Sequence, residues 1–312
     1  MSTVVYIGAV GRSGTTLLER AIAATSPDFV SLGEVVHLWE RGLALDEPCG
    51  CGRPFRSCPF WTAVAERAYG GWDALDLADV RRWKHEADRN RYIPFLWFPR
   101  LAPRRFRDAL ERFVATIDPL YAAIGAEVSE ERGHDVVLVD ASKHPSYYFV
   151  LRRMPHHDVR LLHVIRDPRG VAHSWAKQVE RPEAGDDMEQ LGTWRAAARW
   201  TSHNALLSIG SIRKRRARLR YERFAADPAE LARVVHHLTD DLGATAPDIA
   251  DRTIHLRTDH TVSGNPMRFR TGPVEIRSDE AWRSAMPRRA RIIVSALTFP
   301  QRMISSRTGH RR

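Results

Sequence analysis

The feature that most constrains the fold is a strand, a glycine turn and a helix at the start of the chain. Residues 3–9 are apolar and rich in β-branched side chains, which is typical of a buried parallel strand. Residues 11–14 interrupt the strand, and residues 15–24 have a helical pattern. At such a turn backbone N–H groups converge on an anion, and the helix dipole adds positive potential. The sequence therefore predicts a phosphate-binding loop that consists of Gly11, Arg12, Ser13, Gly14, Thr15 and Thr16.

Strands and helices alternate along most of the chain. Strand patterns recur at residues 29–32, 136–139, 160–165 and 218–221, with helical patterns between them. This alternation predicts an α/β fold with a P-loop-like parallel β-sheet that is flanked by helices. The length of 312 residues fits one large domain, so we expect a single domain over residues 1–312. Residues 73–131 have helical periodicity and predict a helical insertion, which we expect to form a lid over the acceptor.

The chain is strongly basic, with a formal net charge of +10. This charge suggests an anionic ligand, a nucleic acid or a membrane surface as partner. The sequence contains no nucleic-acid recognition motif, so we expect no nucleic-acid partner. No segment approaches the ~20 apolar residues that a membrane span needs. The first residues lack the basic region of a secretory signal, and the sequence thus predicts a cytoplasmic protein.

A second anion site is predicted where the strand at residues 160–165 leads into a helix at residues 168–179. Arg166 follows the strand, and Ser174 lies one to two turns into the helix. A forked guanidinium and a hydroxyl together suit a phosphate monoester. Alternatively, Arg166 and Asp167 cap the helix and bind no ligand.

The loop at residues 11–16 departs from the Walker pattern of nucleotide triphosphatases. That pattern has a lysine where this chain has Thr15, and its leading glycine would fall at Ala9. The lysine neutralises the β- and γ-phosphates beside Mg²⁺, so its replacement argues against a triphosphate ligand. A P-loop kinase or NTPase-like phosphotransferase is the first alternative function, and a non-catalytic nucleotide-binding protein is the second.

The segment Gly-Arg-Ser-Gly-Thr-Thr-Leu-Leu at residues 11–18 resembles the 5′-phosphosulfate loop of sulfotransferases that use 3′-phosphoadenosine 5′-phosphosulfate (PAPS). It is most similar to the bacterial branch that resembles tyrosylprotein sulfotransferases. The resemblance implies PAPS as co-substrate and 3′,5′-ADP as product, with the 3′-phosphate bound by Arg166 and Ser174. Residues 264–270 resemble the C-terminal loop that closes over the cofactor, which implies that Arg268 or Arg270 reaches the 3′-phosphate.

Sulfuryl transfer by in-line displacement needs a base for the acceptor proton and cations for the oxygens that gain charge. Glu34 follows the second predicted strand, where the related tyrosylprotein enzymes carry a Gly-Glu whose glutamate is the base. Lys143 follows the strand at residues 136–139, where the family has a lysine that contacts the transferring group, and Arg12 adds a second cation. Alternatively, Glu34 only begins a helix, Lys143 is a surface residue, and a histidine is the base. The candidate histidines are His37, which could share a helix face with Glu34, and then His85, His144 and His173.

Three cysteines, Cys49, Cys51 and Cys58, fall within ten residues. Their C-x-C-x₆-C spacing is not a standard zinc pattern, and related bacterial sequences carry a similar Cys-Gly-Cys-Gly and Cys-Pro-Phe-Trp pattern. We expect a structural loop without a metal. A redox or disulfide role is the first alternative, and a zinc site completed by His37 or a distant histidine is the second.

Residues 92–98 form an aromatic, apolar run between arginines. The run is either ordinary core or the lining of a lid over a bulky hydrophobic acceptor, with the arginines meeting an anionic head group or a membrane surface. The flanking basic residues are Arg89, Arg91, Arg100, Arg104 and Arg105. We expect the acceptor to be a hydroxylated small molecule or lipid, with peripheral contact to a membrane.

Overall fold

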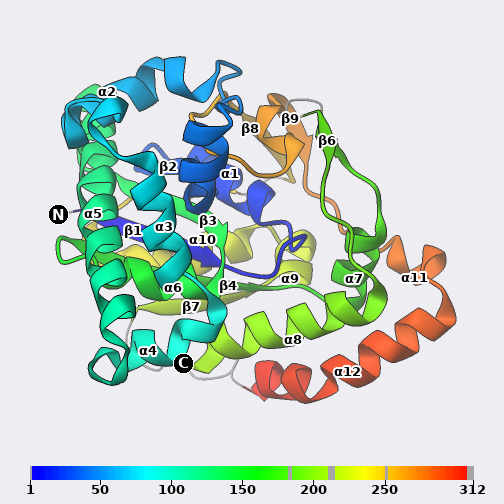
Figure 1. The fold of residues 1–312 in the computed structure, drawn as a ribbon. Coiled ribbons are helices and arrows are strands. Elements are labelled where there is room, and N and C mark those ends of the chain that lie inside the picture. Colours follow the sequence, from blue (N-terminus) through cyan, green and yellow to red (C-terminus); the bar gives the residue numbers. More distant parts are fainter. Residues whose placement is uncertain (1, 182–184, 210–214, 250–251, 308–312) are drawn as a thin grey trace.

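A computed structural model describes residues 2–181, 185–209, 215–249 and 252–307 (Figure 1). In that part of the chain, five strands form one parallel sheet in the order β2-β3-β1-β4-β7. They are β1 (Ser2–Gly8), β2 (Phe29–Gly33), β3 (Val137–Lys143), β4 (His157–Ile165) and β7 (Arg216–Arg220). The predicted α/β fold with a parallel sheet is confirmed, because each predicted strand is present and differs only at its ends.

Helices cover both faces of this sheet, which is why its strands read as continuous apolar runs. On one face, Val4 and Tyr6 of β1 share a core with helices α2 (Pro59–Tyr69), α5 (Arg104–Arg132) and α6 (Pro145–Leu151). On the other face, Val5 and Ile7 pack with α1 (Thr15–Thr25), α9 (Tyr221–Ala226) and α10 (Ala229–Thr239). Alternate residues of one strand thus enter two different cores, as the two-residue period of a strand requires.

Three further helices pack together outside the sheet. Helix α7 (Pro168–Ala176) packs against α8 (Thr193–Ile209), and α12 (Arg288–Arg307) runs along α8 on the outside of the molecule (Figure 1). Trp175, Trp200 and Val294 are buried together at this junction. None of the described helices has both the length and the apolar character that are needed to cross a bilayer.

The region between β2 and β3 is helical, as the periodicity of residues 73–131 indicates. It contains α3 (Leu77–Ala87), α4 (Ile93–Trp97) and α5, and the helical region begins earlier, with α2. Near Glu34 the chain forms short turns in place of an α-helix, a 3-10 turn at Val35–His37 and a π-helical segment at Leu38–Ala44. The segment after β7 adds two short antiparallel strands, β8 (Thr253–Leu256) and β9 (Gly272–Glu275).

A smaller antiparallel pair, β5 (Glu180–Arg181) and β6 (Asp186–Asp187), follows α7. The pair lies in the region between α7 and α8, and α8 begins at Thr193. Because the five main strands are parallel, their carboxyl ends all lie at the same edge of the sheet. Ligands of open α/β sheets bind outside this edge.

Candidate active site

The loop between β1 and α1 has the backbone shape of an anion-binding turn. Arg12 and Gly14 both have positive φ, 71° and 80°. A Cβ atom on Gly14 would lie 2.4 Å from the ring of Tyr221, so the close approach of the two segments requires glycine. Gly14 also occupies the N-cap of α1, and no side chain caps the helix there. The N–H groups of the first turn are therefore available to a ligand.

Arg12 presents a guanidinium with unused donors. Its Nε and Nη2 atoms are buried and have no hydrogen-bond partner. The group lies 5.6 Å from the ring of Trp175, whose Nε1 donates to the carbonyl of Gly11 at 3.0 Å. Burial lowers the pKa of Arg12 and nearby Glu34 opposes that shift, but an arginine stays charged at neutral pH. Buried donors without partners are costly, so this position suits an anion.

Arg166, directly after β4, joins the first loop to the second. Its Nη1 donates to the carbonyl of Arg12 at 2.9 Å, and its Nη2 donates to Oδ2 of Asp279 at 2.9 Å. The guanidinium also lies 4.8 Å from the ring of Tyr221. The cap of α7 is Asp167, whose side chain accepts from the N–H of Arg169. Capping therefore does not use the Arg166 side chain.

Glu34 and Lys143 form an ion pair at the ends of β2 and β3. The Nζ of Lys143 donates to Oε1 of Glu34, and the two side chains are only 12% and 13% exposed. Lys143 has φ of 70°, which is unusual for a residue with a side chain and marks the sharp end of β3. The N–H of Glu34 donates to the carbonyl of Val262 at 2.7 Å, which fixes the backbone beside the carboxylate.

His37 lies close to this pair. Its Nε2 is 3.6 Å from Oε2 of Glu34, and its ring makes an edge contact with His144. Burial, assisted by His144, holds the pKa of His37 well below its usual value. Burial likewise lowers the pKa of His144 to about 3. Both rings are therefore neutral near pH 7, and His37 is the histidine that stands next to the carboxylate.

One cavity of about 1060 Å³ collects these groups at the carboxyl edge of the sheet. The strand order arranges its walls in sequence across the edge. Glu34 follows β2, Lys143 ends β3, the loop at residues 11–16 follows β1, and Arg166 follows β4. Neighbouring strands are about 4.8 Å apart. The two loops that we predicted to bind anions thus lie side by side, and the ion pair of Glu34 and Lys143 lies on the opposite side of the first loop from Arg166.

The model of the sulfotransferase family matches residues 5–243. This chain belongs to the sulfotransferase family. Its fold is similar to the sulfotransferase domain from the curacin biosynthetic pathway, with 14% identity, a TM-score of 0.46, and 96% and 98% of the two chains covered. The sulfotransferase domain of the Synechococcus PCC 7002 olefin synthase is 19% identical with a TM-score of 0.48, and the match covers 96% of this chain and 94% of that one. Sulfotransferase STF9 from Mycobacterium avium is 16% identical with a TM-score of 0.40, and the match covers 77% of this chain and 64% of that one. The search of curated proteins found no match.

Most of the predicted site residues of this sulfotransferase line the central cavity. The described residues that line it include Gly11, Arg12, Gly14, Thr15, Thr16, Glu34, Lys143, Arg166 and Ser174. Ser13 is 1% exposed and is not among them. Neither His85, which is exposed on α3, nor His173, on α7, is among the described residues that line the cavity.

The predicted roles of Arg268 and Arg270 do not fit their positions. Arg268 is 1% exposed, and its guanidinium donates to the carbonyls of Thr261 and Pro48 at 3.1 and 2.8 Å. Arg270 is exposed, and its carbonyl accepts from Arg20. Neither side chain is among the described residues that line the cavity. Their loop contributes Gly264, Asn265 and Met267 instead.

Several cavity residues were not identified from the sequence. Asp279 follows β9 in a segment without a recognisable motif, and it holds the arginine that we expected to bind phosphate. The helical region between β2 and β3 contributes Asp88, Arg89 and Asn90. None of residues 92–98 is among the described cavity residues, and Ile93 and Leu96 are buried in the core. Ile93 and Leu96 of the run are therefore core, Phe98 is exposed on the outer surface, and only the turn before the run reaches the site.

Proposed function

We propose that this sulfotransferase takes the sulfuryl group from PAPS and transfers it to a hydroxyl of a small molecule or lipid by in-line displacement. The observation that carries the proposal is the order of groups across the sheet edge. An anion-binding loop lies in the middle, a second arginine lies on one side, and a carboxylate paired with a lysine lies on the other. PAPS has a 5′-phosphosulfate and a 3′-phosphate, and so needs two neighbouring anion sites beside one reactive position.

The first loop suits the 5′-phosphosulfate. The uncapped start of α1 lines the cavity with Gly14, Thr15 and Thr16, and the helix dipole adds positive potential there. The unpaired Nε and Nη2 of Arg12 provide charged donors. Arg166 and Ser174 are the residues to which we assign the 3′-phosphate, because both line the same cavity next to the first loop. A guanidinium and a hydroxyl give the charge-assisted contacts that a phosphate monoester favours.

Glu34 and Lys143 suit the transfer step. As the acceptor oxygen attacks sulfur, its proton passes to a carboxylate oxygen of Glu34. The bond between sulfur and the bridging phosphate oxygen breaks, and 3′,5′-ADP leaves with the electron pair. Lys143, which already contacts Glu34, is placed to neutralise the oxygens that gain charge. Transfer then depends on positioning and electrostatics more than on covalent chemistry by the protein.

The alternative of a phosphotransferase makes a different demand on the loop. A triphosphatase loop holds a lysine and Mg²⁺ beside the β- and γ-phosphates, whereas this loop carries Thr15 at the lysine position. If the donor is PAPS, brief treatment with EDTA leaves turnover unchanged. Loss of turnover that is restored by Mg²⁺ would favour the phosphotransferase.

The part of the cavity around Glu34 and Lys143, where we place the acceptor, is polar. Asp88, Asn90 and His203 line it together with Glu34 and Lys143. This lining suits a hydroxylated acceptor whose polar groups are bound close to the reacting oxygen. On the outer surface, Phe98 and Leu101 are 61% and 78% exposed beside Arg100. A lipid acceptor would require peripheral contact with a membrane. We propose that this surface makes that contact with an anionic membrane.

The test uses PAPS labelled with radioactive sulfur. The enzyme is incubated with separated lipid, small-molecule and protein extracts, with the Glu34→Gln variant as a control for background transfer. We expect label in the lipid or small-molecule fraction with wild-type enzyme and little label with the variant. Label only in the protein fraction would contradict the acceptor class, and no transfer into any fraction, with no binding of PAPS, would contradict the proposed donor.

A further inference from the structure

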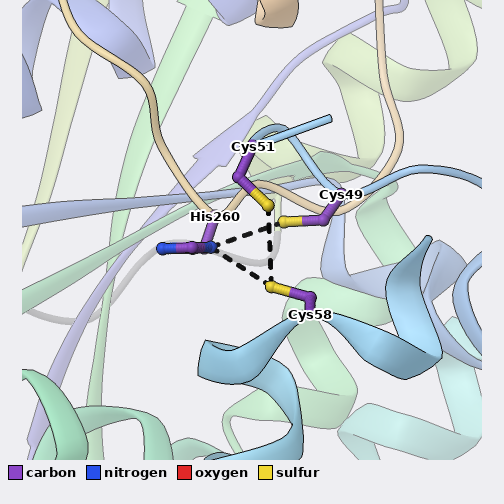
Figure 2. Close-up of side chains that lie close together, drawn as sticks. All are labelled: Cys49, Cys51, Cys58 and His260. Carbon is purple, nitrogen blue, oxygen red and sulfur yellow. Dashed lines mark hydrogen bonds between the residues drawn. The ribbon is translucent and has the colours of Figure 1, made fainter. Parts of the chain in front are cut away.

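The three cysteines meet a histidine from the far end of the chain (Figure 2). The Sγ atoms of Cys49, Cys51 and Cys58 and a ring nitrogen of His260 all lie within 4.8 Å of one another. Cys49 and Cys58 are fully buried, and Cys51 and His260 are partly buried. None of the four lines the cavity of about 1060 Å³, so the cluster is separate from the candidate active site.

Three of the six distances between the ligand atoms are close to the edges of a tetrahedron around one metal ion, and all six lie within 4.8 Å. Sγ of Cys51 is 3.7 Å from Sγ of Cys58, and Nδ1 of His260 is 3.3 and 3.7 Å from Sγ of Cys58 and Cys49. Zinc with ligands at about 2.3 Å for sulfur and about 2.0–2.1 Å for nitrogen has edges of about 3.5–3.8 Å. A disulfide would need the sulfur atoms at about 2.05 Å. Four ligands of this kind without an open position are typical of structural zinc sites.

The surrounding residues hold the ligands in place. The ring of His260 stacks on Phe60 with centroids 4.9 Å apart and an interplanar angle of 16°. Figure 2 shows a ring nitrogen of His260 directed at the thiols. The stacking on Phe60 restricts rotation of the ring away from this position. The N–H of Gly50 donates to the carbonyl of Thr261 at 2.9 Å. A Cβ atom on Gly50 would lie 2.3 Å from Oγ1 of Thr261, so the cysteine turn can approach the histidine segment only with glycine between the two thiols.

We propose that Cys49, Cys51, Cys58 and His260 bind one zinc ion, which ties the turn at residues 48–58 to the segment at residues 259–267. This replaces the expectation of a metal-free loop. The fourth ligand is then a distant histidine, one of the two alternatives from the sequence, and the other, His37, lies beside Glu34 in the active site. The sequence spacing did not point to zinc because the fourth ligand lies 202 positions after Cys58 in the chain.

The zinc site braces one wall of the active site. Val262, two residues after His260, donates to Leu32 and accepts from Glu34 through its backbone, beside the proposed base. Gly264 then lines the cavity. From the other side, Arg20 on α1 binds this segment through Oδ2 of Asp259 at 3.0 Å. The segment is therefore held from α1 by Arg20 and from the cysteine turn by the metal.

The first test measures metal in the protein as purified, by inductively coupled plasma mass spectrometry. We expect about one zinc ion per chain and three free thiols after metal release. X-ray absorption at the zinc edge of the same wild-type protein should give three sulfur ligands and one nitrogen ligand. A chain without metal, or one with a Cys51–Cys58 disulfide detected by mass spectrometry, would overturn the proposal. This test needs no variant, so it does not depend on how substitutions affect folding.

The second test uses His260→Gln with His255→Gln as a matched control, since His255 is exposed on β8. We expect His260→Gln to lose most of its zinc and His255→Gln to keep it. With Co²⁺ in place of zinc, wild-type protein should show the strong absorption of tetrahedral thiolate coordination, and His260→Gln should change that spectrum. Full zinc content and an unchanged cobalt spectrum in His260→Gln would remove His260 from the site.

Hydrogen exchange of the backbone amides tests whether the metal braces the wall of the active site. The exchange rate of residues 257–270 should rise on zinc removal, and an unchanged rate would contradict the bracing role.

Discussion

The central cavity and the cysteine cluster differ in where their polar groups point. In the cavity, Arg12 keeps buried donors without protein partners, and the arginine and lysine side chains face one open space. In the cluster, the thiols of Cys49 and Cys58 and the ring of His260 face one another, and both thiols are buried. Groups that face open space are available to a substrate, whereas groups that converge on one point hold the fold together. The two regions should therefore respond to substitution in opposite ways.

The largest effect should come from Glu34→Gln, which keeps the shape of the side chain and removes its basicity. We expect turnover to fall by about 10²-fold or more, with little change in the melting temperature and in the affinity for 3′,5′-ADP. Steady-state kinetics and calorimetry check this. His37→Asn is the matched variant, since His37 contacts the same carboxylate. If His37→Asn loses turnover and Glu34→Gln does not, the base is the histidine.

The opposite pattern is expected for Cys58→Ser. Loss of a zinc ligand should lower the melting temperature by about 5 °C or more, while the enzyme that remains folded keeps a kcat near that of the wild type. Ser57→Ala is the control, because Ser57 is the exposed neighbour of Cys58. Differential scanning fluorimetry and active-site titration separate the two quantities. A large fall in kcat at an unchanged melting temperature would make the cluster part of the chemistry and end the contrast.

The residues of the central cavity could be placed from the sequence more readily than those of the cysteine cluster. Glu34, Lys143 and Arg166 each follow a strand that is visible in the sequence, and parallel strands bring their ends to one edge. Local pattern and topology were therefore sufficient to place these residues at one edge of the sheet, whereas their expected roles came from the resemblance to a known family. His260 and Asp279 lie near short strands of four residues and reach partners more than a hundred positions away. Such contacts leave no local periodicity.

The position of Arg268 outside the cavity has a similar cause. A sequence shows that a loop carries an arginine, but not whether the guanidinium points to a ligand or to carbonyls of the protein. Here Arg268 donates to Thr261 and Pro48, and these two residues belong to the two segments that the cysteine cluster joins. Residues 92–98 illustrate the same ambiguity for apolar side chains, since a core and a lid have the same composition.

A smaller effect is expected for Asp279→Asn, which sharpens the contrast on the donor side of the cavity. The Asp279 carboxylate binds Nη2 of Arg166 at 2.9 Å, and it would repel a phosphate at the same arginine. Burial raises the pKa of Asp279, but the hydrogen bond and ion pair with Arg166 outweigh burial and keep the pKa below its usual value. The group is therefore negative at neutral pH. We expect the affinity for 3′,5′-ADP to rise about fivefold in titration calorimetry, which is about 1 kcal/mol. Weaker binding in the variant would mean that Asp279 positions Arg166 for the ligand.

The smallest effect concerns Glu19, which supports the active site from within the core. Its Oε1 accepts from Oγ of Ser31 and from the N–H of Gly33, next to the proposed base. Burial raises the pKa of Glu19 from 4.5 to about 8, so the folded protein binds a proton here at pH values where the unfolded chain does not. The contribution of this group to the free energy of unfolding is therefore greatest below pH 4.5 and is lost as pH rises through about 8.

Glu19→Gln keeps the acceptor oxygen and removes the titration. We expect its melting temperature to gain on that of the wild type as pH rises from 5 to about 9, by a few degrees at the upper end. Melting temperatures measured across this range check the sign. Parallel curves for the two proteins would show that Glu19 does not carry the proton that its burial implies.

The most direct test of the account is the binding of 3′,5′-ADP and 5′-AMP, compared by titration calorimetry on the same protein. The two ligands differ by the 3′-phosphate, which we assign to Arg166 and Ser174. Charge-assisted hydrogen bonds contribute about 1.5–3 kcal/mol each, so 3′,5′-ADP should bind at least about tenfold more tightly than 5′-AMP. The Arg166→Met variant should lose this preference. Equal affinities for the two nucleotides in the wild type would contradict the second anion site and, with it, PAPS as the donor.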